Sequence, residues 1–248
     1  MRFLNTVWTL SRISLHIVRC FGMMLGQFIR HGRHWSLNDA GKQAIQQWMS
    51  RLCVILGVEV EVEGEVSEKT VLMVCNHISW LDIIVLSSHY PYSFLSKAEI
   101  KHWPIVGLLA ASSGTLFIKR HSLSGLKHAV ADVGRRLKQG RSVCLFPEGT
   151  TTAQGVQPFK SGLFVTAAQA GVAVQPVAIE YLQEDAAYVD DDHFLSHLLK
   201  QAGKHTIHVR LRFLPPIQAD GDRRNIAQQA QAVIAETLAT NKDVAAVA

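Results

Sequence analysis

A histidine and an aspartate stand five residues apart in the segment Cys75-Asn76-His77-Ile78-Ser79-Trp80-Leu81-Asp82. The apolar run 71–75 before them predicts a strand buried on both faces, and the pattern over 80–89 predicts a helix. His77 therefore falls at the carboxyl end of a strand, where open α/β sheets bind ligands. Asp82, in the first turn of the helix, can hold one imidazole nitrogen, which leaves the other nitrogen free to accept a proton.

The same spacing has a second interpretation. Ser79 and Asp82 match the Ser-x-x-Asp capping box, in which the acidic side chain only ties down the start of a helix. This segment alone does not decide between a general base and a helix cap, so a second group of residues is needed.

A second motif follows another apolar strand. Phe146-Pro147-Glu148-Gly149-Thr150-Thr151-Thr152 contains a proline and a glycine that force a tight turn, which presents Glu148 at the same edge of the sheet as His77. Between the two motifs, a predicted strand ends in Lys119 and Arg120. After them, the run 174–179 places a proline inside a strand-like segment.

In order and spacing, these four segments resemble the motifs of the glycerophospholipid acyltransferase family, specifically the bacterial 1-acylglycerol-3-phosphate acyltransferases. The resemblance covers about Leu72 to Ile179. It implies that His77, oriented by Asp82, acts as the general base on the free hydroxyl of a lysophospholipid. That hydroxyl attacks an acyl thioester, carried by acyl carrier protein or coenzyme A, without an acyl-enzyme intermediate. The lack of a G-x-S-x-G motif agrees with this chemistry.

The resemblance also implies which residues bind the acceptor's glycerol phosphate. Arg120, with Lys119 beside it, matches the cation that ends the family's second motif. Glu148, Gly149 and Thr150 match the turn of its third motif. Arginine suits a phosphate because its planar fork can donate two hydrogen bonds at once.

One position departs from the family pattern. The third motif usually continues with arginine after its threonine, and here that position is Thr151. Lys160, at a predicted helix start, is an alternative source of positive charge, and a helix amino terminus itself favours an anion. Alternatively, the acceptor is a lyso-ornithine lipid, whose headgroup carries a carboxylate and an amine. A third hypothesis is a catalytically silent lipid-binding protein on the same scaffold.

The remaining patterns predict neither a metal nor a cofactor. His193 and His197 stand four apart after three aspartates, but no H-E-x-x-H and no compact third ligand accompany them. No glycine-rich phosphate loop indicates a nucleotide. The four cysteines are scattered singly, which predicts buried thiols in a reducing compartment, the cytoplasm.

The composition favours an anionic surface as the partner. Of the 248 residues, 48% are hydrophobic and only 18% are charged, and the net charge is +5. A basic balance suits phospholipid headgroups or nucleic acid, but aromatic residues are not interleaved with lysine and arginine as in RNA-binding proteins. We therefore expect a phospholipid membrane and no nucleic acid as partner, with the protein peripheral on the cytoplasmic face of a bacterial inner membrane.

The amino-terminal segment 3–29 is almost wholly apolar, but arginines interrupt it too often to leave the ~20 apolar residues of a spanning helix. On a helix, Arg12, Arg19 and Arg30 fall on one line. The flanking polar residues are Asn5, Thr9, His16 and Gln27, and the opposite face carries Val7, Leu10, Ile17, Val18, Phe21, Leu25, Phe28 and Ile29. This pattern predicts a helix lying in the bilayer interface rather than a signal peptide or a helix packed on the protein.

The whole chain divides into two predicted parts. Residues 1–57 form an amphipathic pair of membrane-docking helices, the second running from Ser36 or Asn38 to Leu56 and ending at Gly57. Residues 58–248 form an α/β domain with a mainly parallel mixed sheet flanked by helices. The alternating run 58–63 predicts an edge strand. Other predicted strands are 93–95, 115–119, 142–146, 174–180 and 206–213, and predicted helices are 97–111, 122–139, 161–170 and 223–240.

Overall fold

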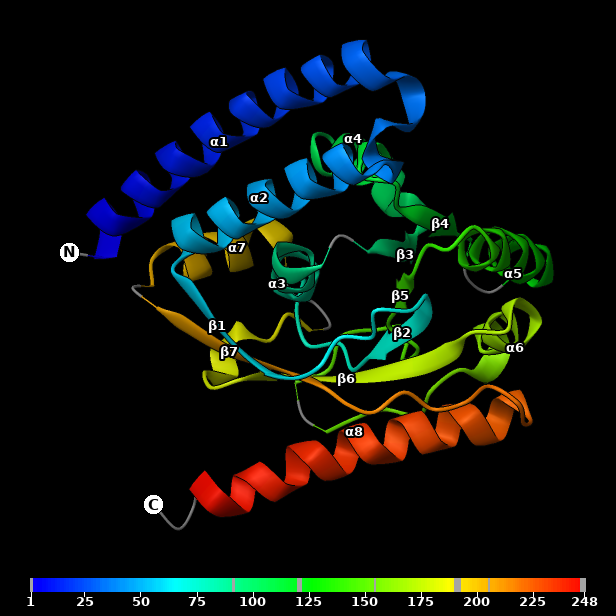
Figure 1. The fold of residues 1–248 in the computed structure, drawn as a ribbon. Coiled ribbons are helices and arrows are strands. Elements are labelled where there is room, and N and C mark those ends of the chain that lie inside the picture. The colour runs from blue at the N-terminus through cyan, green and yellow to red at the C-terminus, as the bar shows by residue number, and fades with distance from the viewer. Residues whose placement is uncertain are drawn as a thin grey trace.

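The structure is a computed structural model that describes residues 2–90, 92–119, 122–153, 155–189, 193–204 and 206–245. Seven strands form one sheet in the order β1-β7-β6-β2-β5-β3-β4 (Figure 1). Neighbouring strands are parallel except for β6 and β7, so the predicted mainly parallel mixed sheet is confirmed. The strands are β1 (Val58–Gly64), β2 (Val71–Cys75), β3 (Ser93–Lys97), β4 (Leu116–Ile118), β5 (Val143–Leu145), β6 (Ala173–Tyr181) and β7 (Ile207–Phe213).

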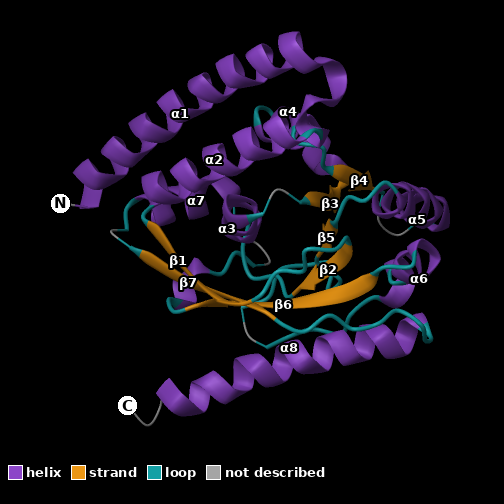
Figure 2. Cartoon of the chain, in the orientation of Figure 1, coloured by secondary structure: helices purple, strands orange, loops and turns teal. Residues whose placement is uncertain are grey.

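Helices cover both faces of this sheet (Figure 2). The helices are α1 (Arg2–His31), α2 (Asp39–Leu56), α3 (Leu81–His89), α4 (Val106–Ser112), α5 (Leu123–Lys138), α6 (Val165–Ala170), α7 (Phe194–Ala202) and α8 (Arg223–Ala245). Helices α2 and α3 pack on one face, and α1 lies outside α2 as a further layer. Helices α5, α6 and α8 pack on the other face.

Strand β2 lies in the centre of the sheet and contributes to both hydrophobic cores. Met73 and Cys75 pack in the core with α2 and α3, whereas Leu72 and Val74 pack in the core with α5, α6 and α8. All five residues of β2 are buried, because alternate side chains of a strand point to opposite faces. The carboxyl end of β2 is therefore a firmly packed support for the residues that follow it.

The ends of α2 follow from capping chemistry. The Asn38 side chain accepts a hydrogen bond from the Gly41 amide at 2.7 Å, which satisfies one of the free donors in the first turn. Gly57 ends the helix with a φ of 70°, a left-handed conformation that glycine adopts without steric cost. Of the two predicted starts, Ser36 and Asn38, the structure has Asn38, and the predicted stop at Gly57 is confirmed.

Two predicted helices are broken in the structure. The segment 97–111 forms a 3₁₀ turn (Ala98–His102) and only then α4, because Pro104 disfavours helical geometry before it and Ile105 has a φ of 65°. The segment 161–170 begins as a 3₁₀ turn (Ser161–Leu163) with a glycine at its centre, and α6 starts only at Val165. Lys160 therefore does not lie at the start of an α-helix.

Helix α1 turns its polar flank toward the protein, not toward water. Thr9 and His16, predicted to flank a solvated arginine stripe, are buried. The His16 ring stacks on Trp48 at 5.1 Å, and its Nε2 lies 3.0 Å from the Trp48 carbonyl oxygen. Burial lowers the pKa of His16. The helical periodicity thus placed Thr9 and His16 on one flank, but it did not show that this flank packs against the protein.

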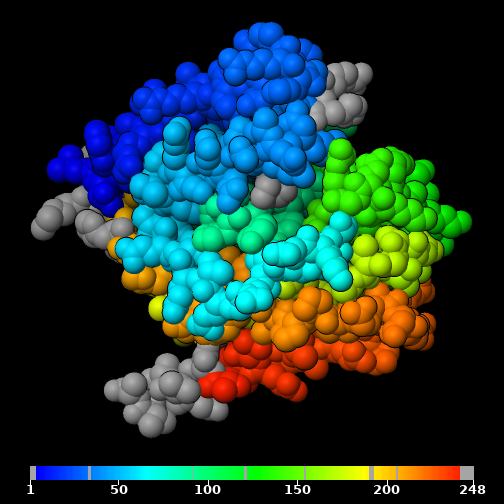
Figure 3. All heavy atoms as spheres, in the orientation of Figure 1, coloured from blue at the N-terminus to red at the C-terminus, as the bar shows by residue number. Residues whose placement is uncertain are grey.

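The outward face of α1 is apolar. Figure 3 shows α1 as an outer layer at the top of the view, on the far side of the molecule from α8. No helix in the described part of the chain combines the length and the apolar composition needed to cross a bilayer. The exposed apolar side chains on α1 are Leu4, Val7, Trp8, Leu15, Val18, Leu25, Phe28 and Ile29.

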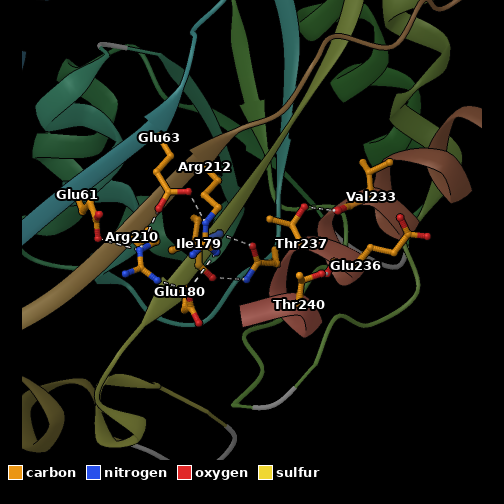
Figure 4. A network of polar contacts seen from close by, with 11 residues as sticks. Glu61, Glu63, Ile179, Glu180, Arg210, Arg212, Val233, Glu236, Thr237 and Thr240 are labelled. Atoms are coloured by element: carbon orange, nitrogen blue, oxygen red, sulfur yellow. Dashed lines mark hydrogen bonds and ion pairs between the residues drawn. The ribbon is translucent and has the colours of Figure 1, made fainter. Parts of the chain in front are cut away.

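Ion pairs join the edge strand β1 to β7 (Figure 4). The parallel register sets Glu61 opposite Arg210 and Glu63 opposite Arg212, with Nε to carboxylate distances of 2.8 and 2.7 Å. Glu180 on β6 reaches the same cluster, 3.1 Å from the Arg212 guanidinium. The valine–glutamate alternation thus gives β1 one apolar face and one charged face, and the predicted edge strand is confirmed.

Replacing Arg212 by methionine is expected to lower the free energy of unfolding by about 2 kcal/mol, because Glu63 and Glu180 lose a cation that is only 9% exposed. Urea unfolding measures the change. The control is Arg210→Met, whose guanidinium is 26% exposed and should contribute less. Equal losses for the two variants would show that burial does not set the contribution of this cluster.

Candidate active site

His77 and Asp82 meet directly after β2. The His77 Nδ1 lies 2.7 Å from the Asp82 Oδ2, and this oxygen also accepts hydrogen bonds from the amides of Ile78 at 2.8 Å and Ser79 at 3.0 Å. A carboxylate in such a position only accepts, so His77 donates from Nδ1 and keeps its Nε2 lone pair free. No residue in the described part of the chain hydrogen-bonds to that Nε2. Asp82 therefore fixes the loop before α3 and orients the histidine, whereas the Ser79 hydroxyl is buried without a hydrogen-bond partner among the described residues and does not complete the predicted capping box.

The second oxygen of Asp82 has a partner that the sequence did not suggest. Tyr181, the last residue of β6, donates its hydroxyl proton to the Asp82 Oδ1 at 2.7 Å. Burial, and then the neighbouring Asp82, raise the pKa of Tyr181 well above its ordinary value, so this hydroxyl stays a donor. The sequence offered one indication of this contact, because Tyr181 stands at the carboxyl end of a predicted strand.

Asn76 fixes the backbone just before the histidine. Its side-chain amide donates to the Ile179 carbonyl at 2.9 Å and accepts from the Ile179 amide at 2.8 Å. The side chain thus continues the pairing of β2 with β6 by one residue beyond Cys75 and Val177. His77 leaves the sheet from an anchored position.

Glu148 joins the second motif to the first. Its Oε1 accepts from the His77 amide at 2.9 Å, and its Oε2 accepts from the Thr152 hydroxyl at 3.2 Å and the Gln157 amide at 3.1 Å. The Thr152 amide in turn donates to the His77 carbonyl at 2.8 Å. The two loops therefore lie together as predicted, and Thr152 joins them although the sequence had not singled it out.

Glu148 also gives a testable dependence on pH. Burial raises its pKa above the ordinary value of 4.5, against the opposing effect of its three donors. A raised pKa means that the folded state binds the proton more tightly than the unfolded chain does. The stability from Glu148 is therefore fully present below pH 4.5 and is lost as the pH rises through the raised value.

We expect the stability of the wild type relative to Glu148→Gln to fall as the pH increases above about 4.5 and then to level off. Urea unfolding of both proteins over a pH series gives this difference. The glutamine variant is the matched control because it keeps the shape of the side chain and does not titrate. A difference that grows with pH would contradict the expectation.

Lys160 lies over the glycine of the turn. Gly149 has a φ of 78°, and a Cβ at this position would collide with the Lys160 Nζ. The positive φ favours glycine here, whereas the flexible lysine end could move aside; the loop also brings one exposed cation to the motif. Thr150, next to it, is exposed.

Lys119, the described member of the predicted pair Lys119–Arg120, makes no contact with the dyad. Lys119 is exposed just after β4, and β5 and β3 separate this strand from β2. Among the described residues, no hydrogen bond or ion pair joins Lys119 to His77 or Asp82. Arg120 lies outside the described residues, so its predicted role stays a prediction.

An apolar cavity of about 280 Å³ begins beside the histidine. The His77 ring stacks on Phe146 with 4.0 Å between ring centroids, and Phe146 lines the cavity. The other walls come from α1, α2, α3, β3, α4 and α7, and include Met23, Met49, Ile83, Phe94 and Leu109. A flexible hydrocarbon chain fits such a lining, because it offers apolar contacts and few polar groups.

Cys75 has no access to a substrate. All four cysteines are free and buried, as predicted. The Cys75 thiol is fully buried 3.6 Å from that of Cys144, and burial raises its pKa well above the ordinary value. It therefore lacks the exposed thiolate of a nucleophile.

Comparison with known proteins gives a consistent result. A family model described as Acyltransferase matches residues 57–180. A lyso-ornithine lipid O-acyltransferase of Pseudomonas aeruginosa is 42% identical over 197 residues, which cover 75% of each chain. A 1-acyl-sn-glycerol-3-phosphate acyltransferase of Neisseria gonorrhoeae is 40% identical over 130 residues, or 52% of this chain and 51% of that protein.

The fold itself has a solved counterpart. The crystal structure of the 1-acyl-sn-glycerophosphate acyltransferase of Thermotoga maritima superposes with a TM-score of 0.72, covering 98% of each chain. At 21% sequence identity, this similarity shows a shared fold. The family model and the relatives carry the assignment further: the chain belongs to the glycerophospholipid acyltransferase family.

Proposed function

We propose that this protein transfers a fatty acyl group from an acyl thioester to the free hydroxyl of a lysolipid. The observation that carries the proposal is the His77–Asp82 pair, 2.7 Å apart, beside an apolar cavity. The His77 Nε2 takes the hydroxyl proton while the oxygen attacks the thioester carbonyl. The carbon–oxygen bond forms, the carbon–sulfur bond breaks, and the departing thiolate receives the proton from His77.

The cavity supports this proposal through its position. Phe146 both stacks on His77 and lines the cavity, so an acyl chain lying inside would bring its carbonyl to the histidine. Asp82 would hold the imidazole and stabilise it while it carries the proton. Acyl carrier protein and coenzyme A are both compatible donors, because each presents the same thioester.

For the acceptor, we put lyso-ornithine lipid first and 1-acylglycerol-3-phosphate second, the reverse of the order that the motifs alone suggested. Thr151 stands where a phosphate-binding arginine is usual, and the Pseudomonas relative of that name matches three quarters of the chain. Lys160 beside Gly149 supplies one cation for the carboxylate of the first acceptor or the phosphate of the second. Glu148, Gly149 and Thr150 would line this part of the site.

An assay of the purified protein separates these possibilities. Acyl carrier protein and coenzyme A thioesters are each offered with lyso-ornithine lipid and with lysophosphatidate. Ester formation on lyso-ornithine lipid alone supports the first acceptor, and ester formation on lysophosphatidate alone reverses the order. No turnover with any pair would favour the catalytically silent lipid-binding alternative.

We also propose that residues 1–57 dock the protein peripherally on the cytoplasmic face of a bacterial inner membrane, while residues 58–248 perform the chemistry. The support is the row of exposed apolar side chains on α1, including Val18 and Leu25. A helix of this kind binds by burying its apolar face in the headgroup region. The protein's positive charge would add attraction to anionic lipid.

Introducing Val18→Asp and Leu25→Asp together is expected to weaken binding to phosphatidylglycerol vesicles by about tenfold or more, because two carboxylates replace exposed apolar side chains that would enter the membrane. Co-sedimentation measures the binding. The control is the double variant Gln228→Asp and Gln229→Asp on α8, on the opposite side of the protein, which adds the same two negative charges at exposed positions. Unchanged binding of the double variant would rule out α1 as the docking surface.

A further inference from the structure

Trp80, inside the His77–Asp82 segment, is held by a histidine more than a hundred residues away in sequence. Its Nε1 donates to the Nδ1 of His197 on α7 at 3.0 Å. An indole nitrogen only donates, so the His197 Nδ1 carries no proton and its Nε2 does. That Nε2 lies 2.8 Å from the Ala187 carbonyl oxygen, to which it donates. His197 is buried, with both ring nitrogens engaged.

A strap of chain, residues 185–188, lies between α7 and the His77 loop. Gln201 on α7 donates from its Nε2 to the Asp185 carbonyl at 2.7 Å. Gln201 also lies 3.2 Å from the His197 Nε2, but two donors face each other there, so the bond to Asp185 is the one that forms. At the other end of the strap, the Tyr188 amide donates to the Ile78 carbonyl at 2.9 Å.

These contacts give His197 a use that differs from metal binding. The spacing of His193 and His197 alone did not predict a metal site, and the aspartates at 190–192 lie outside the described residues. Within the described residues, no group of three metal-ligating side chains forms. The His197 nitrogens instead join α7, the strap and Trp80.

The indole of Trp80 forms part of the wall of the apolar cavity. Its ring stands edge-on to Phe194 at 5.4 Å, and Phe194 packs against Trp103 at 5.6 Å. Trp80 and Phe194 line the cavity together with Phe146, the residue that stacks on His77. An indole released from His197 could turn into this space and alter the wall that an acyl chain would meet near its carbonyl.

We propose that His197 is a positioning residue for acyl transfer: its Nδ1 holds the Trp80 indole as a fixed wall of the cavity beside His77, and so sets how the acyl donor is bound. The inference rests on the proposed acyl transfer. Its first test needs no turnover, so the two can fail separately.

The first test is the indole ¹H–¹⁵N spectrum of the full-length protein, with the Trp80 signal assigned from Trp80→Phe. In the wild type we expect this signal to be shifted downfield by its imidazole acceptor. In His197→Phe, which keeps a ring but removes both nitrogens, it should move to the position of an unbonded indole. In His197→Gln, which keeps an acceptor and a donor, it should stay downfield. A Trp80 signal that is unchanged in His197→Phe overturns the proposal.

The second test separates positioning from folding. We expect His197→Phe to raise the KM for the acyl thioester by about tenfold with kcat changed much less. Without its acceptor, the Trp80 Nε1 donor is left unsatisfied, so the indole no longer holds its place in the cavity wall. His197→Gln should restore most of the wild-type KM. The double variant with Trp80→Phe should be no worse than the poorer single variant, since both remove one contact. A fall in kcat as large as the rise in KM, or additive effects of the two substitutions on KM, overturns the proposal.

Two outcomes keep the inference distinct from the proposed function. If His197→Phe does not fold, Trp80→Phe and His197→Gln give the same comparison. Trp80→Phe, which lacks the hydrogen bond to His197, must then have a higher KM than the wild type. If the wild type turns over no thioester, the acyltransferase proposal fails, and the donor-binding part of this inference fails with it. The indole spectrum still decides whether His197 holds Trp80.

Discussion

Replacing His77 by alanine is expected to lower kcat/KM for acyl transfer by about 10²–10⁴-fold, the usual contribution of a general base. The protein should remain folded, because the imidazole is 17% exposed and Asp82 keeps its bonds to Ile78, Ser79 and Tyr181. Steady-state rates with the preferred acceptor measure the loss. Added imidazole should restore part of the rate by entering the vacated space beside Phe146.

The matched control is His128→Ala, which removes an exposed imidazole from α5, on the opposite face of the sheet from α3, the helix that carries Asp82. Its rate should equal that of the wild type. Vesicle binding should be unchanged in both variants, because neither residue lies on α1. Turnover of His77→Ala within a few-fold of the wild type would remove His77 from the mechanism.

Asp82→Asn is the second large expected effect, with a fall in kcat of about 10³–10⁴-fold. The asparagine oxygen would occupy the Oδ2 position, where three donors need an acceptor, and its NH₂ would face the Tyr181 hydroxyl, which can accept. His77 would keep its orientation, but the imidazolium that forms during the reaction would lose the negative charge that stabilises it. Added imidazole should not rescue this variant, in contrast to His77→Ala.

Asp82→Asn should also destabilise the fold, by about 1–3 kcal/mol, because the Ile78 and Ser79 amides would donate to a neutral oxygen in place of a carboxylate. Tyr181→Phe is the informative comparison, since it removes a bond only from the other oxygen, Oδ1. It should lower stability but leave most of the rate. Comparable rate losses in the two variants would mean that the orientation of the carboxylate, rather than its negative charge, controls catalysis.

The local features of this fold could be predicted from the sequence because each has a local cause. The apolar run of β2, the asparagine and glycine that end α2, and the alternation of β1 all depend on neighbouring residues. The proximity of His77 to Glu148 was also predictable, because both follow parallel strands, β2 and β5, that are adjacent in the sheet.

The remaining features depend on contacts between distant residues. Tyr181 meets Asp82, and His197 meets Trp80, only because the strand order brings β6 next to β2 and the strap then carries the chain to α7. A helical wheel can place Thr9 and His16 on one face of α1, but it does not reveal that Trp48 covers that face. The break before α4 was indicated by Pro104, although the apolar pattern around it favoured a continuous helix.

The charged face of β1 has a consequence for how copies of this protein meet in a crowded cell. β1 is an outer strand of the sheet, and an open strand edge invites edge-to-edge pairing and aggregation. The side chains of Glu59, Glu61 and Glu63 are 68%, 60% and 44% exposed, so a second β1 would bring carboxylates against carboxylates. These glutamates therefore both pair with β7 and oppose edge-to-edge association of two β1 strands.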